Sequence, residues 1–143
     1  IYLFYFTIFF LGGIKLNDKI TILIADDNAD FVTTLVGNLE KENDMEVIGV
    51  ARDGKEAYDK VLKMQPDVLL LDVIMPYLDG IGVLEYINSA SIAKKPMCIM
   101  LSAVGQAKIT QTAISLGAEY THDPRGRRDI DRMSWRIGAN YND

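Results

Sequence analysis

The segment that decides the fold is residues 66–80, PDVLLLDVIMPYLDG. After Pro66, residues 67–71 (DVLLL) form a short apolar run, which is typical of a strand buried on both faces of a sheet. Asp72 follows this run directly. Asp79-Gly80 is a turn signal, and residues 80–87 have the apolar spacing of a helix. The segment therefore predicts a buried strand that ends in a carboxylate and leads into a helix.

The same alternation of strand and helix continues on both sides of this segment. Apolar runs at residues 20–25 (ITILIA), 45–51 (MEVIGVA) and 97–101 (MCIML) predict three further strands. A helical stripe follows each of them, the last containing Ile109, Ala113 and Leu116, with Gly117 as its C-cap. Asp53-Gly54 is a further turn signal. Four strand–helix units in succession indicate an α/β fold with a parallel sheet between two layers of helices.

A fifth strand is expected at residues 119–124, where the sequence reads EYTHDP. Asp123 and Pro124 both disfavour a strand, so the sequence supports the fifth strand–helix unit only weakly.

Composition excludes several classes of protein. The chain has one cysteine, Cys98, so an internal disulfide framework is excluded. Cys98 and His122 together are too few ligands for a Cys/His zinc site. The net charge of −5 argues against nonspecific binding of nucleic acid.

The two ends of the chain differ from its middle. Residues 1–11 (IYLFYFTIFFL) are too few to span a membrane, which takes about 20. Codons for Leu11-Gly12-Gly13 can contain a ribosome-binding sequence upstream of a start codon at Leu16, so we expect residues 1–15 to be an untranslated leader. A short membrane anchor is the alternative. Residues 121–143 contain five arginines and no lysine, which suggests a frameshifted or truncated end after a natural domain at residues 16–120; an arginine-rich surface tail is the alternative.

Carboxylates gather where the predicted strands end. Asp26 and Asp27 follow the first strand and Asp72 follows the third, and these strands are neighbours in the order 2-1-3-4-5. Ser102 follows the fourth strand. Carboxylates packed together repel one another, and Mg²⁺, which prefers oxygen ligands, would relieve that repulsion. A carboxylate beside Mg²⁺ can also act as a nucleophile toward a phosphoryl group.

Each of these residues also has a simpler interpretation. An Asp-Asp pair after a strand is often a helix N-cap, and Asp72 before an apolar stretch could be a turn residue. A phosphatase of the haloacid-dehalogenase type normally has a second Asp two residues after its nucleophile, and Ile74 stands there. Dinucleotide binding is disfavoured because no glycine-rich turn follows the first strand.

Five separated motifs, found in order within residues 19–120, resemble the receiver domain of bacterial response regulators. They are Asp26-Asp27, ARDGKEA (51–57), the segment 66–80, IMLSA (99–103) and LGAEY (116–120). The amino-acid sequences of several motifs most resemble those of regulators that control sporulation. The resemblance implies a flavodoxin-like (βα)5 fold of sheet order 2-1-3-4-5, in a cytoplasmic protein.

The resemblance also implies a role for each site residue. Asp72 matches the phosphoacceptor, which makes the domain a self-phosphorylating acceptor rather than an enzyme. Asp26, Asp27, Asp72 and the backbone carbonyl of Ile74 match the Mg²⁺ ligands, and Ser102 matches the hydroxyl that binds the phosphoryl group. The implied partners are a sensor histidine kinase or a histidine phosphotransfer protein, and a second receiver on phosphorylation.

Two departures from the family pattern follow Tyr120. The family has a Lys-Pro dipeptide at the end of its fifth strand, whereas Asp123 precedes Pro124 here and no lysine follows Lys108. The 143 residues also leave no length for a DNA-binding domain. The alternative function is therefore a defective receiver that lacks the switch lysine and acts only as an interaction module.

Overall fold

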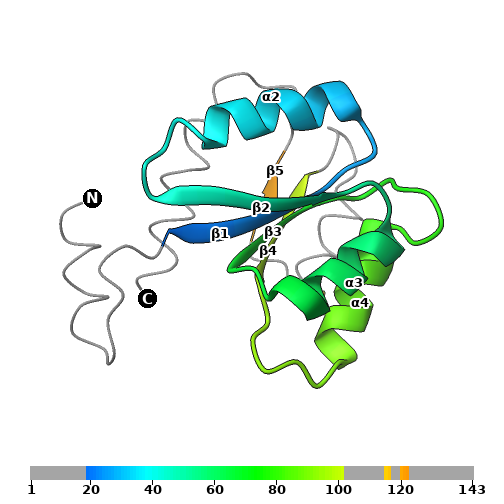
Figure 1. The fold of residues 1–143 in the computed structure, drawn as a ribbon. Helices are drawn as coiled ribbons and strands as arrows, with labels where there is room; N and C mark the ends of the chain where they lie inside the picture. Colours follow the sequence, from blue (N-terminus) through cyan, green and yellow to red (C-terminus); the bar gives the residue numbers. More distant parts are fainter. Residues whose placement is uncertain (1–18, 102–114, 117–119, 123–143) are drawn as a thin grey trace, which may run out of the picture.

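The fold is a parallel sheet with helices on both faces (Figure 1). The computed structural model describes residues 19–101, 115–116 and 120–122. The five strands lie in the order β2-β1-β3-β4-β5, which confirms the expected topology. In chain order the elements are β1 (Ile20–Ala25), α2 (Ala29–Leu39), β2 (Met45–Ala51), α3 (Gly54–Met64), β3 (Val68–Asp72), α4 (Gly80–Ser89), β4 (Met97–Leu101) and β5 (Tyr120–His122).

Alternate residues of the buried strands face opposite layers of helices. Ile22 and Ile24 of β1 belong to one core cluster with Leu35 of α2. Leu23 and Ala25 belong to the other, which includes residues of α3 and α4. Figure 1 shows α2 on one face of the sheet and α3 with α4 on the other. Burial on both faces explains why the strands are continuous apolar runs rather than alternating ones.

Most of the predicted elements are confirmed. The first, second and fourth strands have the expected bounds, whereas β3 begins and ends one residue later than predicted. α4 extends past the predicted end to Ser89. The weakly supported fifth strand is present over three residues and pairs in parallel with β4.

Two expectations change or fall outside the described residues. Asp53-Gly54 is not a separate turn, because Asp53 is the N-cap of α3 and Gly54 is its first residue. Of the expected fourth helix the structure describes Ser115, which is helical, and Leu116. The proposed leader, residues 1–15, and almost all of the tail lie outside the described residues.

Side chains at the amino ends of β1 and β3 hold the two strands in register. Asp67 Oδ2 accepts hydrogen bonds from Thr21 N at 2.8 Å and Thr21 Oγ1 at 2.9 Å. Asp67 N donates to Thr21 Oγ1 at 3.0 Å in return. Lys94 pairs with the other carboxylate oxygen of Asp67. These contacts lie at the amino ends of the two strands, whereas Asp26 and Asp72 lie at their carboxyl ends.

No helix among the described residues is long and apolar enough to cross a membrane.

Candidate functional site

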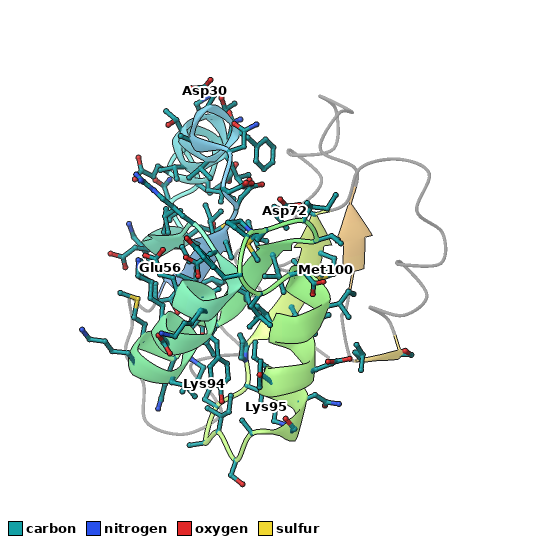
Figure 2. All side chains as sticks on the ribbon, turned by 90° about the vertical axis from the view of Figure 1, so that its right-hand side faces the viewer. Asp30, Glu56, Asp72, Lys94, Lys95 and Met100 are labelled. Carbon is teal, nitrogen blue, oxygen red and sulfur yellow. The ribbon has the colours of Figure 1, made fainter. Side chains whose placement is uncertain are left out.

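Three carboxylates meet at the carboxyl ends of β1 and β3. Asp26 and Asp27 follow β1 directly, and Asp72 is the last residue of β3. One ligand oxygen from each lies within 4.8 Å of the other two. Asp26 is buried at 6% exposure, Asp72 is half-buried and Asp27 is exposed. Figure 2 labels Asp72, the member of this group that ends β3.

Backbone groups fix the position of Asp26. Its N–H donates to the carbonyl of Ala51, the last residue of β2, at 3.0 Å. Its Oδ1 accepts from the N–H of Asn28 at 2.8 Å. Asn28, and not either aspartate, is the N-cap of α2, with its side chain accepting from Phe31 N at 3.1 Å. The interpretation of the Asp pair as a helix N-cap is therefore wrong, and both carboxylates are available to the site.

The loop from Asp72 to α4 is held by close backbone contacts. Gly80 N donates to the carbonyl of Val73 at 2.9 Å, which closes the loop at its base. A Cβ on Gly54 would lie 1.9 Å from the carbonyl oxygen of Leu78, so only glycine fits at the start of α3. Leu78 N donates to Pro76 O at 2.8 Å across Tyr77, whose φ of 66° places it in the left-handed region. The loop is therefore tightly specified beside the carboxylates.

The pKa values of the carboxyl groups reflect their crowding. Burial raises the pKa of Asp72 to about 6, and the Asp26 charge adds to this rise, whereas hydrogen bonds from the backbone N–H groups of Ile74 and Val73 oppose it. Burial also raises the pKa of Asp26, with a hydrogen bond from the Asn28 backbone opposing it and the charge of Asp27 adding to it. A positive charge placed beside these groups would lower their pKa values, because it would favour the ionised carboxylates.

The structure brings together the three predicted carboxylates. Ser102 lies outside the described residues. Ile74 lies on the loop after Asp72 and is 66% exposed. Sequence reasoning missed Ala51 and the backbone of Asn28, since main-chain partners leave little signal in side-chain identity.

Comparison with known proteins identifies the family. A family model described as the response regulator receiver domain matches residues 22–121. The chain belongs to this family. Receiver domains are parts of two-component systems, in which they accept phosphoryl groups and interact with histidine kinases or phosphotransfer proteins.

Solved receiver domains share this fold. The response regulator domain of CheB from Thermotoga maritima is 30% identical, with a TM-score of 0.79; the match covers 87% of this chain and 98% of that one. The signal receiver domain of a response regulator described as NarL from Mycobacterium tuberculosis is 26% identical, with a TM-score of 0.77 and coverage of 85% and 98%. CheY in a CheX–CheY–BeF₃–Mg²⁺ complex from Borrelia burgdorferi is 27% identical, with a TM-score of 0.74 and coverage of 87% and 90%.

Proposed function

We propose that this receiver domain accepts a phosphoryl group on Asp72 from a phosphohistidine of a sensor kinase or phosphotransfer protein. The observation that carries the proposal is the meeting of three carboxylates within 4.8 Å at the carboxyl ends of β1 and β3. Ligands of open parallel sheets bind at this edge. Membership of the receiver family supports the same reaction.

The carboxylates fit a Mg²⁺ ion. Asp26, Asp27 and Asp72 supply hard oxygen ligands, which Mg²⁺ prefers. Mg²⁺ usually binds one or two carboxylates together with waters and phosphate oxygens. We propose the Ile74 carbonyl as the fourth protein ligand. Receiver domains bind Mg²⁺ at the phosphorylation site, and the complex of Borrelia burgdorferi CheY is described with this ion. When bound, Mg²⁺ neutralises the charge that gathers on the transferring oxygens.

Each of these residues has its own role in the proposed phosphoryl transfer. A carboxylate oxygen of Asp72 attacks phosphorus and forms a new P–O bond, while the P–N bond to the donor imidazole breaks and its electron pair leaves with the imidazole. The backbone N–H groups of Ile74 and Val73 hold the Asp72 carboxylate in place. Ser102 is proposed to donate its hydroxyl to a phosphoryl oxygen.

The more specific role of the domain is proposed from the amino-acid sequences of two motifs. MEVIGVARDGKEA (45–57) and DVIMPYLDGIGVLE (72–85) resemble regulators of sporulation, which supports a cytoplasmic phosphorelay that controls sporulation transcription. In such a regulator, phosphorylation would shift a two-state equilibrium toward a dimer of receivers.

The test is the intact mass of the full chain after incubation with acetyl phosphate and Mg²⁺. We expect the parent to gain one phosphoryl group and Asp72→Asn to gain none, because the amide cannot act as the nucleophile. Asp30→Asn, in the first turn of α2 and exposed, is the matched control and should be labelled like the parent. Circular dichroism establishes that all three proteins are folded. A folded parent that remains unlabelled, or an Asp72→Asn variant that is labelled, would refute the assignment.

A further inference from the structure

One peptide group connects the buried carboxylate of the site to helix α3. The carbonyl of Ala51 accepts from Asp26 N at 3.0 Å. The N–H of the same peptide unit belongs to Arg52, and it donates to Glu56 Oε2 at 2.9 Å. The Ala51–Arg52 peptide is therefore bound on one side by the backbone of Asp26 and on the other by the carboxylate of Glu56.

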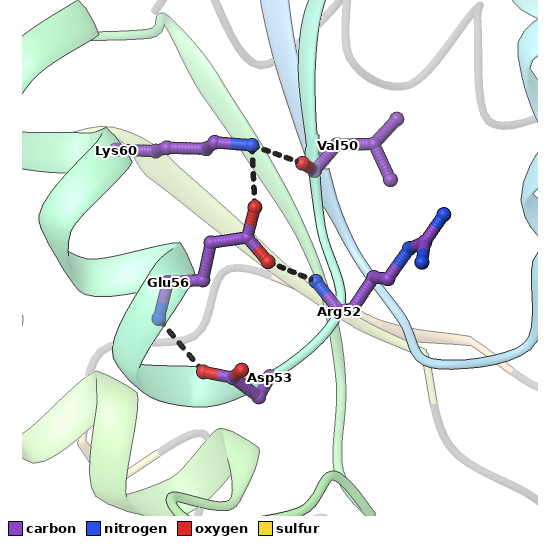
Figure 3. A network of polar contacts seen from close by, with 5 residues as sticks. All are labelled: Val50, Arg52, Asp53, Glu56 and Lys60. Carbon is purple, nitrogen blue, oxygen red and sulfur yellow. Dashed lines mark hydrogen bonds and ion pairs between the residues drawn. The ribbon is translucent and has the colours of Figure 1, made fainter.

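Other contacts hold the Glu56 carboxylate in place, as Figure 3 shows. Its second oxygen, Oε1, pairs with Lys60 Nζ at 2.7 Å, one helical turn further along α3. Lys60 Nζ also donates to the carbonyl of Val50, in the edge strand. At the backbone, Glu56 N donates to Asp53 Oδ1 at 2.8 Å, so the residue is fixed at both ends. The Lys60 contact and the Arg52 N–H lower the pKa of Glu56, which therefore stays ionised at neutral pH.

We propose that Glu56 is a positioning residue for Asp26 and acts through the Ala51–Arg52 peptide. A hydrogen bond from an N–H to a charged carboxylate is stronger than one to a neutral group, and it polarises the peptide so that its carbonyl becomes a better acceptor. Here the carbonyl is that of Ala51, which accepts a hydrogen bond from Asp26 N. The side chain of Asp26 is buried, and a hydrogen bond from the backbone of Asn28 orients it. This inference rests on the proposed function, since it assigns Asp26 to the Mg²⁺ site.

Three variants of the full chain separate this role from ordinary helix capping. Glu56→Ala removes the acceptor for Arg52 N–H. Glu56→Gln removes the charge but keeps an amide oxygen that can accept the same hydrogen bond. Asp53→Ala removes the N-cap of α3, including the bond from Glu56 N, but keeps the Glu56 side chain as an acceptor for the Arg52 N–H.

Two properties are measured by nuclear magnetic resonance on each folded variant. The first is hydrogen exchange of the Asp26 and Arg52 amides without metal. The second is the Mg²⁺ dissociation constant, obtained by titrating MgCl₂. In Glu56→Ala we expect exchange at both amides to accelerate about tenfold and the dissociation constant to rise about fivefold. Glu56→Gln keeps an acceptor but loses the charge, so it should fall between the parent and Glu56→Ala on both properties. Asp53→Ala should stay within about twofold of the parent on both, despite its lower stability.

Each outcome supports or overturns the proposal. Equal effects of Asp53→Ala and Glu56→Ala would show that only the end of the helix matters, which overturns it. An unchanged Asp26 amide in Glu56→Ala would also overturn it. If the parent itself shows no response to Mg²⁺, the proposed function fails, and the connection from Glu56 to Asp26 is then decided by the metal-free exchange of the Asp26 amide.

Discussion

At the scale of single residues, Asp72 has a raised pKa because burial and the charge of Asp26 disfavour its ionised form. The unfolded chain has no such neighbours, and its carboxyl has the ordinary pKa of 3.8. Between pH 3.8 and about 6 the folded state therefore binds more protons than the unfolded state. It follows that the stability of the metal-free protein falls as the pH rises through this window.

The pH dependence gives the first prediction at this scale. In EDTA at pH 7.5, Asp72→Asn should be more stable than the parent by about 1 kcal/mol, a value reduced for the partial exposure of the group. The difference should shrink as the pH falls below about 6, where the parent becomes protonated. Urea denaturation at pH 7.5 and pH 4.5 measures both values. A variant that is less stable than the parent at pH 7.5 without metal would contradict the electrostatic account.

At the scale of elements, the loop after β3 and the start of α3 depend on each other. The Cα of Gly54 lies against the Leu78 carbonyl, so any side chain there must displace either the helix or the loop. The same loop contains the Ile74 and Val73 N–H groups that bond to Asp72. The position of α3 therefore affects the site even though α3 contributes no carboxylate to it.

Substitution of glycines in two helices tests this dependence. Gly54→Ala should destabilise the protein by about 2 kcal/mol or more, because its Cβ would overlap backbone atoms of Leu78. Gly37→Ala is the matched control, since Gly37 is exposed on α2 and a Cβ there would meet nothing within 4 Å. It should stabilise the protein by about 0.5–1 kcal/mol. Denaturant midpoints followed by circular dichroism compare the two, and a neutral Gly54→Ala would contradict the packing argument.

Sequence patterns predicted the strands well because each buried strand is a continuous apolar run with a polar residue at its end. The error at β3 has a physical cause: Asp67 looks like part of the run, but its carboxylate bonds to Thr21 before the strand begins. Asp72 looks like a residue beyond the strand, yet it pairs with Leu101 in the sheet. The grouping of Asp26, Asp27 and Asp72 followed from strand order alone. The bond from Asp26 N to the Ala51 carbonyl could not be predicted, because a contact between backbone groups does not depend on which side chains are present.

At the scale of the whole molecule, the site lowers the stability of the fold, because three carboxylates lie together in a chain that already has a net charge of −5. A cation that binds the folded state and not the unfolded state must stabilise the fold by mass action. The proposed Mg²⁺ site therefore has a consequence for global stability that requires no phosphorylation.

Thermal unfolding with and without MgCl₂ tests this consequence. At a Mg²⁺ concentration ten times the dissociation constant, the parent should gain about 1.4 kcal/mol of stability. Asp27→Asn should lose most of that gain while remaining folded, because Asp27 is exposed. NaCl at matched ionic strength controls for general screening. An equal rise of the melting temperature in both proteins would indicate that Mg²⁺ acts elsewhere.

The contacts between Thr21 and Asp67 also bear on which ion the site selects. Thr21 lies five residues before Asp26, and Asp67 lies five residues before Asp72. A slip of β3 along β1 by one residue would move Asp72 by about 3.3 Å. That displacement is comparable with the 4.8 Å within which the three oxygens lie. By opposing that slip, Thr21 and Asp67 at the amino ends of the two strands help to keep the spacing of the three carboxylates. At the proposed site, discrimination between Mg²⁺ and the larger Ca²⁺ would then depend in part on two side chains that touch neither ion.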